Sequence, residues 1–134
     1  MEEKRIYSVS PSVIVPSVSG PTKTVQPLGR QAAQLAHAVG KVRFQQARLA
    51  VDSIGYEPIT TILLSCRDTR ELLHVIDLLT RARIQHERFY DKNEPAYGLG
   101  TGHILTAVAT HPIQPSKVDH ILGYLPLFLE GVNR

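Results

Sequence analysis

Apolar and small residues recur every three or four positions between Leu28 and Val42, and this spacing predicts an amphipathic helix. We expect the helix to run from about Leu28 to Ser53, because Pro27 precedes it and Gly55 follows as its stop. The positions expected to face the core are Leu28, Ala32, Leu35, Val39 and Val42.

The same helix carries two further lines of residues. Arg30, Gln34, His37 and Lys41 share one side, which we expect to face outward, and such a line is most often a solvated face. The alternative is that this line borders a binding site. The third line is Ala33, Ala36 and Gly40, which have almost no side chain and would let a backbone or a ligand approach closely.

Runs of β-branched and apolar residues predict four strands, at about 12–18, 60–65, 85–90 and 103–110. A second helix is expected after Asp68, which stands three residues before Glu71 as in a capping box, and a third begins at Pro115. Residues 1–11 are polar and contain Pro11, so they are interpreted as a tail or an edge strand. This order predicts an α/β fold with helices on both faces of a mostly parallel or mixed sheet.

Composition limits the class of protein. A chain of 134 residues with 43% hydrophobic content suits one domain, 1–134, with a real core. The net charge of +3 permits an anionic partner without requiring one. A single cysteine, Cys66, excludes an intramolecular disulfide and a cysteine-rich zinc site and fits a reducing compartment. We find no signal-peptide pattern or membrane-spanning run, and predict a cytoplasmic protein without membrane association.

The segment from Asp91 to Gly102 is the expected functional loop, because glycines at 98, 100 and 102 lie beside polar residues. These glycines precede a strand, the reverse of the order that a nucleotide-binding loop needs. Asp91 by itself could simply begin a turn. The six histidines show no ligand-like spacing, so we expect neither a metal nor another cofactor.

Three segments together resemble the type 2 peptidyl-tRNA hydrolase family: GRQAAQLAHAV, the loop from Asp91 to Thr101, and VDHILGYLPLF. The family motifs are G-K-x-A-A-Q-x-[AS]-H-A, D-A-G-R-T-Q-x-x-x-G-[ST] and D-x-V-T-G-H-L-x-L, and their order and spacing agree over about Leu28 to Phe128. The resemblance implies a three-layer α/β/α domain with a four-stranded mixed sheet, often a homodimer. It also implies cleavage of the ester that joins a peptide to the 3′ ribose of tRNA.

Carried over by position, the resemblance makes Asp91, Arg30, Gln34 and Thr101 the catalytic candidates. Asp91 could orient or deprotonate water, and Gln34 and Thr101 could hydrogen-bond the ribose or the ester. Arg30, which stands where the family has lysine, could hold a phosphate or an oxyanion but cannot act as a base. The candidate tRNA-binding residues are Lys23, Arg30, Lys41 and Lys92. His37 matches the family histidine, and we interpret it as structural because no acidic or serine partner stands at motif spacing.

Two stretches depart from the family pattern. Glu94-Pro95-Ala96 replaces R-T-Q, and the nearly neutral SGPTKTVQPL replaces a lysine-rich approach to the first helix. Two hypotheses therefore stand: a peptidyl-tRNA hydrolase, or a non-catalytic homodimeric binding or regulatory module on the same fold. The apolar segment YLPLFL, residues 124–129, is expected to pack on the body or on a partner.

Overall fold

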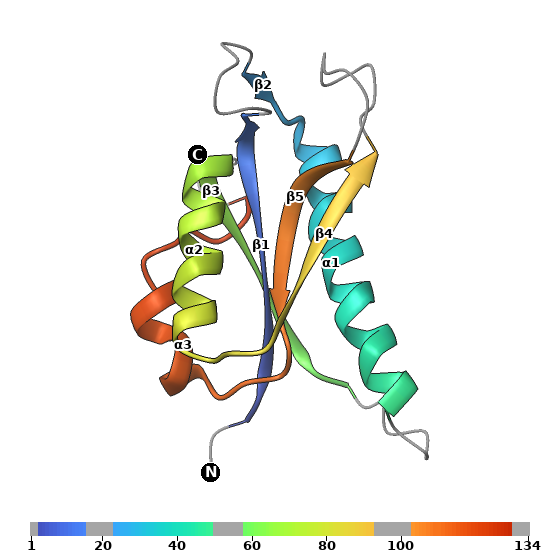
Figure 1. The fold of residues 1–134 in the computed structure, drawn as a ribbon, viewed down its shortest axis with the longest axis vertical. Helices are drawn as coiled ribbons and strands as arrows, with labels where there is room; N and C mark the ends of the chain where they lie inside the picture. The colour runs from blue at the N-terminus through green and yellow to red at the C-terminus, as the bar shows by residue number, and fades with distance from the viewer. Residues whose placement is uncertain (1–2, 16–22, 50–57, 93–102, 130–134) are drawn as a thin grey trace.

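A computed structural model describes residues 3–15, 23–49, 58–92 and 103–129, and Figure 1 shows their arrangement. A five-stranded sheet is covered by helix α1 on one face and by α2 and α3 on the other. The elements are β1 (Arg5–Ile14), β2 (Thr24–Val25), α1 (Leu28–Leu49), β3 (Thr60–Asp68), α2 (Thr69–Arg81), β4 (His86–Lys92), β5 (His103–Thr110) and α3 (Pro115–Leu122). The α/β class with helices on both faces is therefore confirmed.

Strand β1 is the centre of the sheet. It pairs in parallel with β3 along one edge. On the other edge it pairs antiparallel with β5 at Ser8 and Val9, and with β2 at Val13 and Ile14. β4 pairs antiparallel with β5. The predicted four-stranded sheet, mostly parallel or mixed, is thus not matched in detail: β2 is a fifth strand, and β1–β3 is the one parallel pair among the described strands.

The prediction that residues 1–11 form a tail or an edge strand is also wrong. Ile6 and Val9 are fully buried, and the two serines between and beside them are buried as well. The hydroxyl of Ser8 donates to the carbonyl of Leu35 at 2.9 Å, and that of Ser10 donates to the carbonyl of Thr106 at 2.7 Å. Serine residues whose hydroxyls donate to backbone carbonyls can lie in a core, although a sequence with several serines suggests a solvent-exposed segment.

Pro11 lies inside this central strand, paired with Cys66 of β3. A proline is usually excluded from such a place because it lacks an N–H donor. Here it falls between the positions where β5 and β2 pair with the opposite edge of β1. Its carbonyl accepts a hydrogen bond from Nε2 of Gln26 at 2.6 Å, so the side chain of Gln26 replaces a strand partner.

Helix α1 confirms the predicted start at Leu28, and its predicted end near Ser53 lies outside the described residues. Its buried face includes the predicted Leu35 and Val42, but the prediction is wrong for Leu28, which is 47% exposed, and it left out Gln31, which is 1% exposed. The amide of Gln31 donates to the carbonyl of Ser10 at 2.8 Å and to the hydroxyl of Ser65 at 2.9 Å. The helix is turned so that its glutamines reach the sheet, because these hydrogen bonds offset the cost of burying the amides.

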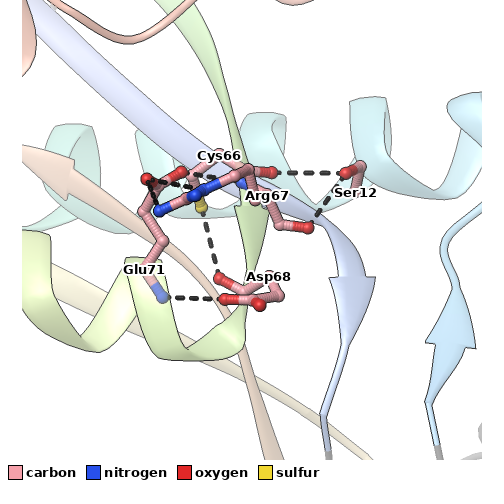
Figure 2. Close-up of polar contacts among 5 residues, drawn as sticks. All are labelled: Ser12, Cys66, Arg67, Asp68 and Glu71. Atoms are coloured by element: carbon pink, nitrogen blue, oxygen red, sulfur yellow. Dashed lines mark hydrogen bonds and ion pairs between the residues drawn. The ribbon is translucent and has the colours of Figure 1, made fainter.

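Helix α2 begins as predicted. Oδ1 of Asp68 accepts from the backbone N–H of Glu71 at 2.9 Å, which is the N-cap bond. The carboxylate of Glu71 turns to Arg67, accepting from its backbone N–H at 2.8 Å and from its guanidinium. Figure 2 shows these contacts around the junction of β3 and α2.

The apolar segment at 124–129 packs on the body of the protein. The backbone N–H of Phe128 donates to the carbonyl of Leu63 at 2.8 Å, and that of Ser65 donates to the carbonyl of Pro126 at 3.0 Å. Leu125 is buried, whereas Leu127 is 53% exposed. The segment therefore protects the outer edge of β3. None of the helices in the described ranges is both long and apolar enough to cross a bilayer.

Candidate functional site

A shallow hollow of about 510 Å³ lies between the first turns of α1 and the end of β4. Four residues that the sequence pattern singled out line it together: Arg30, Gln34, His37 and Asp91. Pro27 and Ala33 complete the wall, and Ala33 belongs to the line of small residues. The fold thus unites the polar line of the helix with the carboxylate that follows 57 positions after Gln34.

Gln34 is the best-defined group in this hollow. Its Nε2 donates to Oδ2 of Asp91 at 2.8 Å, and its Oε1 accepts from the hydroxyl of Thr106 at 3.0 Å. The expectation that Gln34 faces outward is wrong, because the residue is 2% exposed. Burial is tolerated since both ends of the amide have partners. The amide holds one oxygen of the carboxylate in place.

Thr106 is the residue that sequence reasoning missed. It lies in the apolar run HILTAVAT of β5 and is fully buried. Besides Gln34, its hydroxyl lies 3.5 Å from the carbonyl of Phe89 on β4. A threonine in the middle of a buried strand was the available signal, because a buried hydroxyl must find a hydrogen-bond partner.

Arg30 and Asp91 are both half-buried at the rim of the hollow. Arg30 stands one helical turn before Gln34, so its side chain starts from the same side of α1. A guanidinium presents planar, fork-like donors suited to phosphate or to a developing oxyanion, and a carboxylate can orient water. These two groups bring opposite charges to one hollow.

His37 and Lys41 continue the line along α1. The ring of His37 stacks on Phe89 with centroids 4.9 Å apart and an interplanar angle of 22°. Nζ of Lys41 donates to the carbonyl of Arg88 at 2.8 Å. The stack supports the structural interpretation of His37, and both contacts attach α1 to β4 beside the hollow.

The remaining predicted site residues are less fully described. Lys23 is exposed and precedes β2. Lys92 is the last residue of β4 and pairs with His103 of β5; the structure describes the backbone of Lys92 but not its side chain. Thr101 and the rest of the expected functional loop, 93–102, lie outside the described residues. Among the residues that are described, no group of three or more His, Cys, Asp or Glu side chains could hold a metal ion.

A second polar cluster, at the β3–α2 junction, has a structural role (Figure 2). Cys66 is 3% exposed, and its Sγ lies 3.6 Å from the carbonyl of Asp68. Burial raises the pKa of the Cys66 thiol well above its usual range, and the nearby carboxylates of Glu71 and Asp68 raise it further. A thiol kept protonated is a poor nucleophile, so Cys66 is a packing residue.

Comparison with known proteins identifies the family to which the chain belongs. Residues 25–128 match the family described as peptidyl-tRNA hydrolase PTH2. A search of curated proteins finds no match. The matched range starts in β2 and ends in the segment that covers β3, so it includes both walls of the hollow. The chain belongs to the peptidyl-tRNA hydrolase PTH2 family.

Proposed function

We propose that this protein hydrolyses the ester between a peptide and the 3′ ribose of tRNA, with the hollow at Arg30, Gln34 and Asp91 as its active site. The observation that carries the proposal is the hydrogen bond from Gln34 to Asp91 within a hollow that also contains Arg30. Family membership supplies the reaction class.

Each group has a distinct role in the proposed reaction. Asp91, with Oδ2 fixed by Gln34, orients the attacking water and accepts its proton. Arg30 stabilises the oxyanion that forms on the ester carbonyl or holds the terminal phosphate, and it stays protonated throughout. Gln34 is a positioning residue. Thr101 is proposed as a hydrogen-bonding partner of the ribose or the ester.

Basic residues, one of which lines the hollow, would hold the tRNA backbone. Lys41 lies along the same side of α1, and its bond to the carbonyl of Arg88 uses one of the three N–H donors of an ammonium group. Lys23, Lys92 and Arg30 complete the proposed set. Phosphate contacts release counterions, so binding of tRNA should weaken steeply as salt concentration rises.

The test compares hydrolysis of peptidyl-tRNA by the wild-type protein and by Asp91→Asn and Arg30→Ala. We expect Asp91→Asn to lower kcat by at least about a hundredfold, because an amide cannot accept the proton of water. Arg30→Ala should lower kcat/KM on a similar scale through loss of charge stabilisation. Asp119→Asn and Arg70→Ala, at exposed positions of α3 and α2, are the matched controls.

Wild-type rates in both Asp91→Asn and Arg30→Ala would contradict the assignment of the site. Salt-dependent tRNA binding without hydrolysis by the wild-type protein would contradict the catalytic proposal and favour the binding module instead. Gel-shift measurements at two salt concentrations beside the hydrolysis assay distinguish these results.

A further inference from the structure

A second hollow, of about 470 Å³, lies at the opposite end of the sheet from the candidate site. Its lining residues come from the end of α2, the start of α3 and the residue before β1. In the β4–β5 ladder, the pair His86–Thr110 is near this end and the pair Asp91–Ile104 is near the other. At about 3.3 Å per strand residue, the two ends are roughly 17 Å apart.

Three cationic side chains from separate parts of the chain, Lys4, Arg83 and Lys117, line this second hollow together with the imidazole of His120. Its lining contains no carboxylate, whereas the hollows at Arg30, at Arg67 and at Arg5 include Asp91, Glu71 and Asp119 respectively. Grouping like charges is unfavourable unless an anion joins them.

The four side chains have no hydrogen-bond or ion-pair partner among the residues that the structure describes. The neighbouring Arg81 differs, since its Nε lies 3.0 Å from Oδ2 of Asp77. Cations that protein carboxylates leave uncompensated, around a concave surface, favour an anionic ligand.

The backbone of Arg83 adds an independent observation. Arg83 follows the C-cap Ala82 of α2 and has φ of 58°, the left-handed conformation that glycine adopts most easily. An arginine at this position is held in an unfavourable conformation while its side chain lines the hollow.

The N-terminal end of helix α3 lies at this second hollow. Gln114, its N-cap residue, lines the hollow and makes no side-chain capping bond, and Pro115 follows at the first helical position. The first turn has no acidic residue. The positive end of the helix dipole therefore adds to the field of the three cations Lys4, Arg83 and Lys117.

We propose that this hollow binds a phosphate group, carried either by a small phosphate ester or by an RNA backbone. Arg83 and Lys117 are the main anchors, Lys4 and His120 contribute further donors, and the start of α3 contributes its dipole. The site is separate from the hollow at Arg30 and does not depend on the proposed hydrolysis.

The test is titration of the full chain with inorganic pyrophosphate, followed by amide NMR shifts and by calorimetry. We expect saturable shifts at the start of α3, around Lys117, and about tenfold weaker binding in both Arg83→Gly and Lys117→Gln. Arg70→Gln, which removes an exposed cation from α2, should bind as the wild type does. Arg83→Gly should melt at or above the wild-type temperature, because glycine relieves the left-handed strain.

Deacylated tRNA provides the second arm. Weaker tRNA binding by Arg83→Gly than by Arg70→Gln assigns the phosphate to RNA, whereas unchanged tRNA binding with lost pyrophosphate binding assigns it to a small ester. The proposal is overturned if pyrophosphate causes no saturable shift near Lys117, if it perturbs the first turns of α1 instead, or if Arg83→Gly and Arg70→Gln bind it equally.

Discussion

Oδ2 of Asp91 accepts a hydrogen bond from the side-chain amide of Gln34 at 2.8 Å, although the two residues are 57 positions apart. The hydroxyl of Thr106 donates a hydrogen bond to Oε1 of Gln34 at 3.0 Å. The amide therefore cannot flip to turn Oε1 toward the carboxylate without losing this bond. The orientation of Asp91 thus depends on a threonine of β5.

Replacing Thr106 by valine keeps the side-chain shape and removes the hydroxyl. We expect the free energy of unfolding to fall by about 1–2 kcal/mol, because Oε1 of Gln34 then lacks its donor. Urea denaturation measures the change, and Thr61→Val at an exposed position of β3 is the control. Equal stability of the two variants would show that Thr106 does not hold the amide.

Gln31 gives a second prediction. Its amide is buried and makes two hydrogen bonds to β1 and β3, so Gln31→Leu should destabilise the protein by about 2 kcal/mol or more. Gln46→Leu, later in the same helix, should change stability by less than about 0.5 kcal/mol. Thermal and urea unfolding of both variants check this, and a neutral Gln31→Leu would contradict the assigned role.

The cap of α2 is tested by Asp68→Ala. Losing the acceptor for the N–H of Glu71 should cost about 1 kcal/mol of stability. Asp68→Asn retains a side-chain oxygen at this position and should remain within a few tenths of a kcal/mol of the wild type. If alanine and asparagine are equivalent in urea denaturation, the capping bond contributes no net stability.

Cys66 should react slowly with thiol reagents while the protein is folded. Its pKa is raised above the usual value, chiefly by burial, so at any given pH a smaller fraction is thiolate than in the unfolded chain. We expect labelling at pH 8 to be on the order of a hundredfold slower in the native protein than in denaturant. Equal rates would mean that the thiol is accessible.

Elements with regular patterning and a clear boundary could be predicted from the sequence. Strand β5 has the predicted bounds, 103–110, and α3 starts at the predicted Pro115 and ends at Leu122, before Gly123. The N-cap Asp68 was likewise evident from its spacing to Glu71. These features depend on residues close together in the sequence, so the sequence alone was sufficient to predict them.

Features that depend on long-range hydrogen bonds could not be predicted. The burial of Ser8, Ser10 and Gln34 requires carbonyls and side chains that lie far away in the sequence. The same holds for the candidate site. Motif positions in the sequence singled out Arg30, Gln34, His37 and Asp91. Thr106 could be recognised only from the packing of α1 on β5.

The central place of β1 has a consequence for biosynthesis. β2 and β3 are synthesised soon after β1, but one edge of β1 has to wait for β5: the N–H of Tyr7 bonds to the hydroxyl of Thr110, 103 positions later. Closing such distant contacts is slow, and it leaves the edge of β1 that pairs with β5 uncovered during synthesis. Most of the chain must therefore be made before its first strand can be enclosed, and we expect ribosome-bound fragments that end before β5 to aggregate or to bind chaperones.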